Sequence, residues 1–124
     1  MCVQIPVRWM APESVLDRKY SVASDVWSFG VLMWEVYRRG GKPYAELSIN
    51  ALMGAVLQGH RLSQPEMCST EVSVHTSLLD PLADAVCRYE LMQLCWELHA
   101  EERPSFRTLQ AQLLLELSSE ESRV

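Results

Sequence analysis

Lysine is scarce in this sequence, and basic residues form no cluster larger than a pair. Lys19 and Lys42 are its only lysines, and acidic residues outnumber basic ones by 16 to 11, which gives a formal net charge of −5. Proteins that bind nucleic acids need clustered lysine and arginine side chains to neutralise phosphates. The composition therefore predicts no nucleic-acid partner, and we expect the Arg38-Arg39 pair to offset the dipole at the end of a helix.

Cysteine motifs and long apolar runs are also missing. The four cysteines show no CxxC spacing and no histidine at a zinc-ligand interval; they are Cys2, Cys68, Cys87 and Cys95. Scattered thiols of this kind are typical of a reducing compartment, so we expect no metal site and a cytoplasmic location. Residues 1–6 show neither a charged leader nor an apolar core, which predicts no secretory signal. Glu35 interrupts the longest apolar run, which predicts no membrane segment.

The strongest positive signal is a helix over residues 24–38. Ser24 or Asp25 is expected to cap its start, and Gly40-Gly41 to end it. A helix with apolar residues on every side must be buried on most sides. Such residues cover nearly the whole circumference here: Val26, Trp27, Phe29, Val31, Leu32, Met33, Trp34, Val36 and Tyr37. A length of 124 residues allows one domain with a modest core, but this helix is expected at the centre of a larger domain than 124 residues easily supply.

Shorter helices are predicted around this central one, and no segment is a convincing strand. They cover residues 11–16, 48–58 and 89–98, and a final helix has Pro104 in its first turn and runs to about residue 117. Residues 1–9 are expected to be extended, because Pro6 fixes its own backbone and biases Ile5 away from helix. The pattern predicts a mainly α fold.

Three motifs follow one another along the chain: PVRWMAPES at 6–14, SDVWSFGVLMWE at 24–35 and CWELHAEERPSF at 95–106. In combination they resemble the C-terminal part of the catalytic domain of protein tyrosine kinases, over residues 5–72 and 89–117. The resemblance implies the helical C-terminal half of a protein-kinase-like C-lobe, without the N-lobe sheet. It divides the chain into a partial kinase domain at 1–117 and a polar tail at 118–124, which we expect to fray.

The first motif resembles the segment that forms the floor under the protein substrate in tyrosine kinases. By this resemblance Ile5, Pro6, Val7 and Arg8 are candidate substrate-binding residues. Pro6 suits the role because its rigid ring offers an apolar surface on which the phenol ring of a tyrosine can lie. The alternative for this segment is an ordinary extended linker.

The resemblance also assigns structural roles. Glu13 of the Ala-Pro-Glu motif is expected to pair with Arg103, in a bidentate contact between distant segments. Asp25 matches a family residue that binds the backbone of the catalytic loop; no such loop is present in this sequence, so Asp25 is expected to act as a helix cap. Trp27 and Trp96 are expected to pack in the core.

The motifs that carry phosphoryl transfer in kinases are not found in these 124 residues. There is no GxGxxG loop, no HRD sequence and no DFG sequence, and these supply the nucleotide cradle, the base and a magnesium ligand in the family. The resemblance thus implies no catalytic, cofactor-binding or metal-binding residue in this chain. ATP and Mg²⁺ are expected only in a longer parent.

Residues 73–88 depart from the family pattern, because the matched segments on either side normally join directly. Pro81 discourages one continuous helix through this insert. Residues 83–86 could form a helical turn, or the whole segment could be an irregular surface loop. Its origin is open between a genuine insertion and a splicing or gene-model error.

Three functions remain open at the level of sequence. In the first, the chain is a fragment of a tyrosine kinase that phosphorylates protein tyrosine in a longer parent. In the second, it is a non-catalytic protein-binding or dominant-negative module derived from a kinase C-lobe. In the third, no stable product of this length exists. The expected partners are protein substrates or regulators of tyrosine-kinase signalling. The residues of the first motif favour a receptor-type parent, whose kinase domain would lie on the cytosolic side of a membrane.

Overall fold

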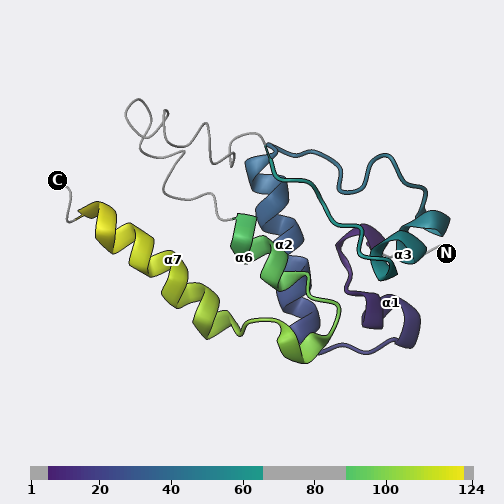
Figure 1. The fold of residues 1–124 in the computed structure, drawn as a ribbon, viewed down its shortest axis with the longest axis horizontal. Helices are drawn as coiled ribbons and strands as arrows, with labels where there is room; N and C mark the ends of the chain where they lie inside the picture. Colours follow the sequence, from purple (N-terminus) through teal and green to yellow (C-terminus); the bar gives the residue numbers. More distant parts are fainter. Residues whose placement is uncertain (1–5, 66–88, 122–124) are drawn as a thin grey trace.

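The computed structural model describes residues 6–65 and 89–121, with side chains up to residue 113, and this part of the chain holds helices and no strands (Figure 1). The expectation of a mainly helical fold is therefore confirmed. The elements are η1 (Val7–Trp9), α1 (Pro12–Asp17), α2 (Val22–Tyr37), α3 (Ile49–Leu57), α6 (Tyr89–Cys95), η3 (Ala100–Glu102) and α7 (Phe106–Glu121). The 73–88 insert lies outside the described residues.

Helix α2 lies between the other elements, with α6 and α7 on one side and α1 and α3 on the other (Figure 1). It contacts α6, η1 and η3. The approach of α6 is close because Gly30 has no side chain: a Cβ there would lie 2.7 Å from both Cys95 Cβ and Trp96 Nε1. The glycine therefore allows the central contact of the fold.

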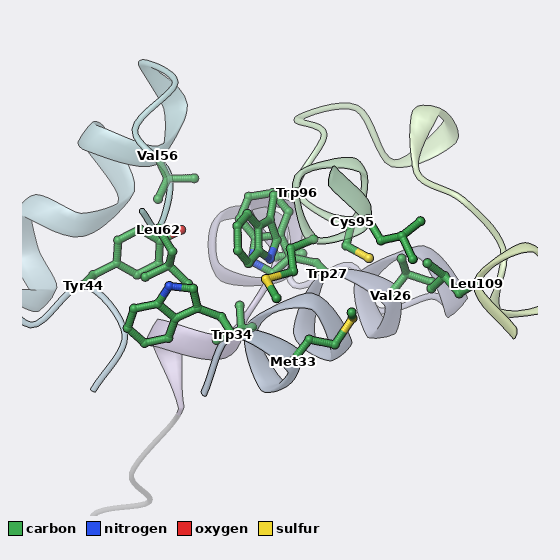
Figure 2. Close-up of a cluster of buried hydrophobic side chains, with 14 of the residues drawn as sticks. Val26, Trp27, Met33, Trp34, Tyr44, Val56, Leu62, Cys95, Trp96 and Leu109 are labelled. Atoms are coloured by element: carbon green, nitrogen blue, oxygen red, sulfur yellow. The ribbon is translucent and has the colours of Figure 1, made fainter. Parts of the chain in front are cut away.

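The core is one cluster of buried side chains that extends from α2 to α3 on one side and to α6 and α7 on the other (Figure 2). Trp27 and Trp96 are its largest fully buried members. Burial raises the pKa of the Cys95 thiol to about 12, so this thiol stays protonated at neutral pH. The core also includes Val26, Val31, Met33, Trp34, Tyr44, Leu52, Val56, Leu62, Leu91, Met92 and Leu109.

The start of α2 differs from the sequence prediction. Ser21 is the N-cap, and its hydroxyl accepts a hydrogen bond from the Ser24 amide at 3.2 Å. Ser24 completes a capping box, since its own hydroxyl accepts from the Ser21 amide at 2.8 Å. The prediction of Ser24 or Asp25 as the cap was wrong because it overlooked this reciprocal pair three residues apart. Asp25 instead lies in the first turn and is exposed.

Helix α2 is buried around only part of its circumference by the described residues, so the expectation of burial on most sides was too broad. Val22, Leu32 and Val36 are exposed by 63%, 52% and 65%. Together with Phe29, these three residues have a heptad-like spacing along the helix. Phe29 is half-buried and contacts Phe106 edge-to-face, with ring centroids 5.7 Å apart. The described residues leave this apolar stripe open to solvent.

Several helix ends also differ from the predictions. Pro6 is followed by a 3-10 turn, because the Trp9 amide donates to the Pro6 carbonyl at 3.0 Å. The sequence had predicted an extended backbone for this segment. Helix α6 ends at Cys95, before the predicted 98. Helix α7 starts after Ser105, whose hydroxyl accepts from the Thr108 amide at 3.0 Å, so Pro104 lies outside the helix.

Two further points concern α7 and α3. Helix α7 continues to Glu121, beyond the start of the expected polar tail at Ser118. Helix α3 agrees with its prediction, and Ser48 caps it by accepting from the Ala51 amide at 3.2 Å. Within the described ranges, none of the helices has both the length and the hydropathy that crossing a bilayer requires.

Candidate functional site

The candidate substrate floor is the segment from Pro6 to Trp9, and the structure places it against α2 and the loop before α3. Pro6 is exposed and Val7 is half-buried, so these two residues supply the accessible surface. Ile5, the fourth residue predicted for this floor, lies outside the described residues.

Arg8 points away from the floor surface and is buried. Its guanidinium donates hydrogen bonds to three backbone carbonyls of the loop before α3, those of Pro43 at 3.3 Å, Tyr44 at 2.6 Å and Leu47 at 2.9 Å. A planar guanidinium with five N–H donors suits this cluster of carbonyls better than a lysine would. Arg8 therefore fixes the position of the floor, and its charged group does not face a substrate.

The loop that receives Arg8 has an unusual backbone conformation. Tyr44 has a φ of 53°, in the left-handed region that side-chain-bearing residues rarely adopt. Its ring is buried in the core, and burial raises the pKa of its phenol to about 12. The buried ring of Tyr44 and the Arg8 hydrogen bonds hold the loop in place.

Trp9 fastens the other end of the floor to α2. Its indole N–H donates to the Glu35 carboxylate, and its carbonyl accepts from the Ser28 hydroxyl at 2.7 Å. Glu35 and Ser28 lie two turns apart along the same helix. Neither contact could be predicted from a residue pattern, because a serine and a glutamate in a helix are most often surface residues.

Glu13 and Arg103 form a bidentate ion pair. Arg103 Nη1 lies 2.7 Å from Glu13 Oε2, and Nη2 lies 2.8 Å from Oε1. The side chain of Arg103 is 0% exposed and that of Glu13 is 19% exposed. Burial of Glu13 opposes ionisation, but the hydrogen bond and the charge of Arg103 outweigh it and lower the pKa of Glu13.

Arg103 also bonds to the backbone around it. It donates to the carbonyls of Ala23 at 3.0 Å, Glu97 at 2.8 Å and Leu98 at 3.2 Å. One buried guanidinium thus joins α1, the first turn of α2 and the segment after α6. Buried charges are tolerated when they are paired and hydrogen-bonded in this way.

Two guanidinium groups lie close to the ring of Trp27. The guanidinium carbons of Arg103 and Arg61 are each 5.1 Å from its ring centroid. Arg61 also donates to the carbonyls of Trp96 and Val56, both at 2.8 Å. Sequence reasoning placed Trp27 and Trp96 in the core, where the structure has them, but missed Arg61, since no local pattern distinguishes it from a surface arginine.

A hollow of about 290 Å³ lies beside the floor, lined by Pro6, Met10, Ser14, Tyr20, Ser24, Asp25 and Ser28. Asp25, predicted as a structural residue, borders this hollow. The described residues include no group of three or more His, Cys, Asp or Glu side chains that could hold a metal ion. The hollow therefore offers hydroxyls and a single carboxylate beside an apolar floor.

Comparison with known proteins places this arrangement in a family. A model of the family described as protein tyrosine and serine/threonine kinase matches residues 2–113. The chain is 42% identical over 106 residues to the platelet-derived growth factor receptor beta of Rattus norvegicus, and equally so to that of Mus musculus. The match covers 85% of this chain and 8% of each receptor. The chain therefore belongs to the protein tyrosine and serine/threonine kinase family, and its resemblance to a part of a receptor tyrosine kinase domain is confirmed.

Proposed function

We propose that this chain forms the substrate-side part of a tyrosine kinase catalytic domain, which phosphorylates protein tyrosine in a longer protein. The floor from Pro6 to Trp9 carries the proposal. Arg8 and Trp9 use their polar groups to fasten this segment to the helical body, which leaves the Pro6 and Val7 surface accessible. A preorganised apolar surface of this kind costs little to order when a phenol ring binds on it.

We further propose that residues 1–124 alone transfer no phosphate. Transfer needs a nucleotide cradle, a base and magnesium ligands, and the corresponding motifs do not occur in this sequence. Asp25 is a free-standing carboxylate beside the floor, but one carboxylate is not enough to position both a metal and a hydroxyl. ATP and Mg²⁺ are cofactors of the longer protein in this proposal.

Photocrosslinking tests the floor. A tyrosine peptide that carries a benzophenone side chain in place of its acceptor phenol is irradiated with the chain, and the crosslinked residues are mapped by mass spectrometry. We expect saturable crosslinks within 6–10, with weak affinity in the millimolar range, about −4 kcal/mol. A peptide with alanine at the acceptor position should compete poorly. Crosslinks scattered over the surface would refute the floor assignment.

The expected partners follow from the same surface. In a receptor-type parent the floor would lie on the cytosolic side of the membrane and would receive protein substrates or regulators of tyrosine-kinase signalling. The acidic chain and its few scattered basic residues do not favour a nucleic-acid partner.

The second candidate function is a non-catalytic docking module. One face of α3 favours it, because Ile49 and Leu57 are exposed two turns apart and Met53 lies half-buried between them. A helix face with apolar anchors at this spacing can bind a protein groove. Competition with a full-length kinase for a shared partner, lost on Ile49→Glu substitution, would favour this function over the first.

A further inference from the structure

We propose that Ser21 is a phosphorylation site for a basophilic serine kinase, meaning one that selects substrates by basic residues before the acceptor serine. Ser21 lies between α1 and α2, in a run of seven exposed residues at 16–22. Tyr20 before it and Val22 after it are exposed by 71% and 63%. A modifying enzyme can therefore reach Ser21 without disturbing the core.

The charge pattern around Ser21 is the first argument. Arg18 and Lys19 stand three and two positions before it, and both are exposed. Neither forms an ion pair with another described residue, so their charges are available to an acidic enzyme surface. Kinases choose among serines by charge patterns of this kind. The apolar Val22 directly after Ser21 suits an apolar floor like the one formed by Pro6 and Val7 in this chain.

The backbone is the second argument. Ser21 is extended, with φ −153° and ψ 175°, which is the form in which a peptide can lie along an enzyme cleft. Val22 is the first residue of α2, and its amide has no partner within the helix. Releasing Ser21 into the cleft therefore disturbs the cap contacts with Ser24 and the bond from the Asp25 amide to the Ser21 carbonyl. Drawing Lys19 in with it also breaks two bonds to α1, from the Lys19 amide to the Glu13 carbonyl at 3.2 Å and from the Ser14 hydroxyl to the Lys19 carbonyl at 2.7 Å.

Ser48 provides an internal comparison. It is an exposed helix cap like Ser21, and its hydroxyl likewise accepts a backbone hydrogen bond, from Ala51. The residues before it are Glu46 and Leu47, so it lacks the basic pattern. The two serines share the cap hydrogen bond from the amide three residues further on, at 3.2 Å in each case, and differ in the charge of the residues before them. Selective modification of Ser21 would thus be due to Arg18 and Lys19, and not to its place at a helix start.

The reaction uses ATP as the phosphoryl donor. The γ-phosphoryl group moves to Ser21 Oγ, the bond to ADP breaks, and the modifying kinase's catalytic aspartate accepts the hydroxyl proton. The product carries roughly −1.5 to −2 charge at neutral pH. That charge lies next to Tyr20 and Ser24, which line the hollow beside the floor. Phosphorylation would therefore make the rim of this hollow, which already contains Asp25, strongly acidic.

The test uses the full 124-residue chain, ATP–Mg²⁺ and the purified catalytic subunit of cyclic-AMP-dependent protein kinase. Mass spectrometry locates the phosphate and initial rates are measured. The variant Arg18→Asn with Lys19→Gln removes both charges, and asparagine tolerates the left-handed backbone at position 18, where φ is 55°. The matched control is Arg38→Gln with Arg39→Asn, because Arg39 has a φ of 56° and no serine follows it closely.

We expect phosphate on Ser21 and none on Ser48. The first variant should react about tenfold more slowly or worse, because charge steering is lost, and the control should match the wild type. Ser21→Asn keeps a good cap and should abolish the modification. Equal phosphate on Ser48, no phosphate on Ser21, or an unchanged rate in the first variant would each overturn the proposal. Matching thermal melts of the variants show that folding is not the cause.

Discussion

Arg103 and Glu13 are 90 positions apart in the sequence and joined by two hydrogen bonds of 2.7 Å and 2.8 Å. The pair links α1, directly after the substrate floor, to the segment before α7. The side chain of Arg103 is wholly buried, so the Glu13 carboxylate is needed to offset the cost of burying its positive charge. The pair thus fastens α1, the helix that follows the floor, to the rest of the helical body.

Glu13→Gln should destabilise the chain strongly. The neutral amide leaves the Arg103 charge buried without a counter-ion, and breaking one side of a buried pair costs about 3–5 kcal/mol. Urea unfolding, followed by tryptophan fluorescence, measures the loss. Glu46→Gln is the control, because Glu46 pairs with His60 at the exposed surface, and little change is expected there. Equal stability of the two variants would show that the buried pair is not important.

The same pair predicts a loss of stability in acid. The pKa of Glu13 is lowered in the folded chain, by hydrogen bonding and charge from Arg103 that exceed the opposing effect of burial. Its contribution is therefore present above the ordinary glutamate pKa of 4.5 and is lost as the pH falls through the lower folded value. Stability measured from pH 6 downward should fall more steeply for the wild type than for Glu13→Gln. Parallel curves would contradict the assignment.

Gly30→Ala and Gly54→Ala should have opposite effects, although both glycines lie in helices. A Cβ at position 30 meets Cys95 and Trp96 at 2.7 Å, and overpacking of this kind costs about 1–3 kcal/mol. A Cβ at position 54 meets nothing within 4 Å. There alanine should stabilise the helix by about 0.5–1 kcal/mol. Thermal melts compare the two, and a harmless Gly30→Ala would mean that α2 and α6 are further apart than described.

Arg8→Gln should loosen the floor. The shorter amide cannot reach the carbonyls of Tyr44 and Leu47 together, and each unsatisfied buried group costs about 1–3 kcal/mol. Hydrogen exchange should become faster at residues 42–47 and 7–10, and peptide crosslinking to the floor should weaken. Arg38→Gln serves as the control, because Arg38 is exposed at the end of α2. Unchanged exchange in the first variant would show that Arg8 does not position this segment.

The sequence allowed the class of fold and the main packing residues to be predicted, because these depend on local patterns and on recognisable motifs. The helix at α2, the cap at Ser48 and the burial of Trp27 and Trp96 follow from such patterns. Contacts made by long polar side chains with distant backbone could not be predicted. Arg61, which reaches the Trp96 carbonyl across 35 positions, is such a case.

The cap of α2 and the direction of Arg8 illustrate two other limits. Two serines, Ser21 and Ser24, lie near the start of α2, and their reciprocal hydrogen bonds decide that Ser21 is the cap. Arg8 was grouped with the substrate-contacting residues because its neighbours belong there. A 3-10 turn at Val7–Trp9 directs its side chain inward, and a pattern of residue types does not reveal that turn.

A titration followed by ¹H–¹⁵N NMR tests the central claim most directly, namely that this chain forms a substrate floor but not the nucleotide site. The labelled chain is titrated first with a tyrosine peptide and then with ATP–Mg²⁺. We expect saturable shifts at the amides of residues 7–10 with the peptide, and no saturable shifts with the nucleotide. Saturable shifts with ATP–Mg²⁺, or a peptide response that leaves residues 7–10 unchanged, would contradict the account.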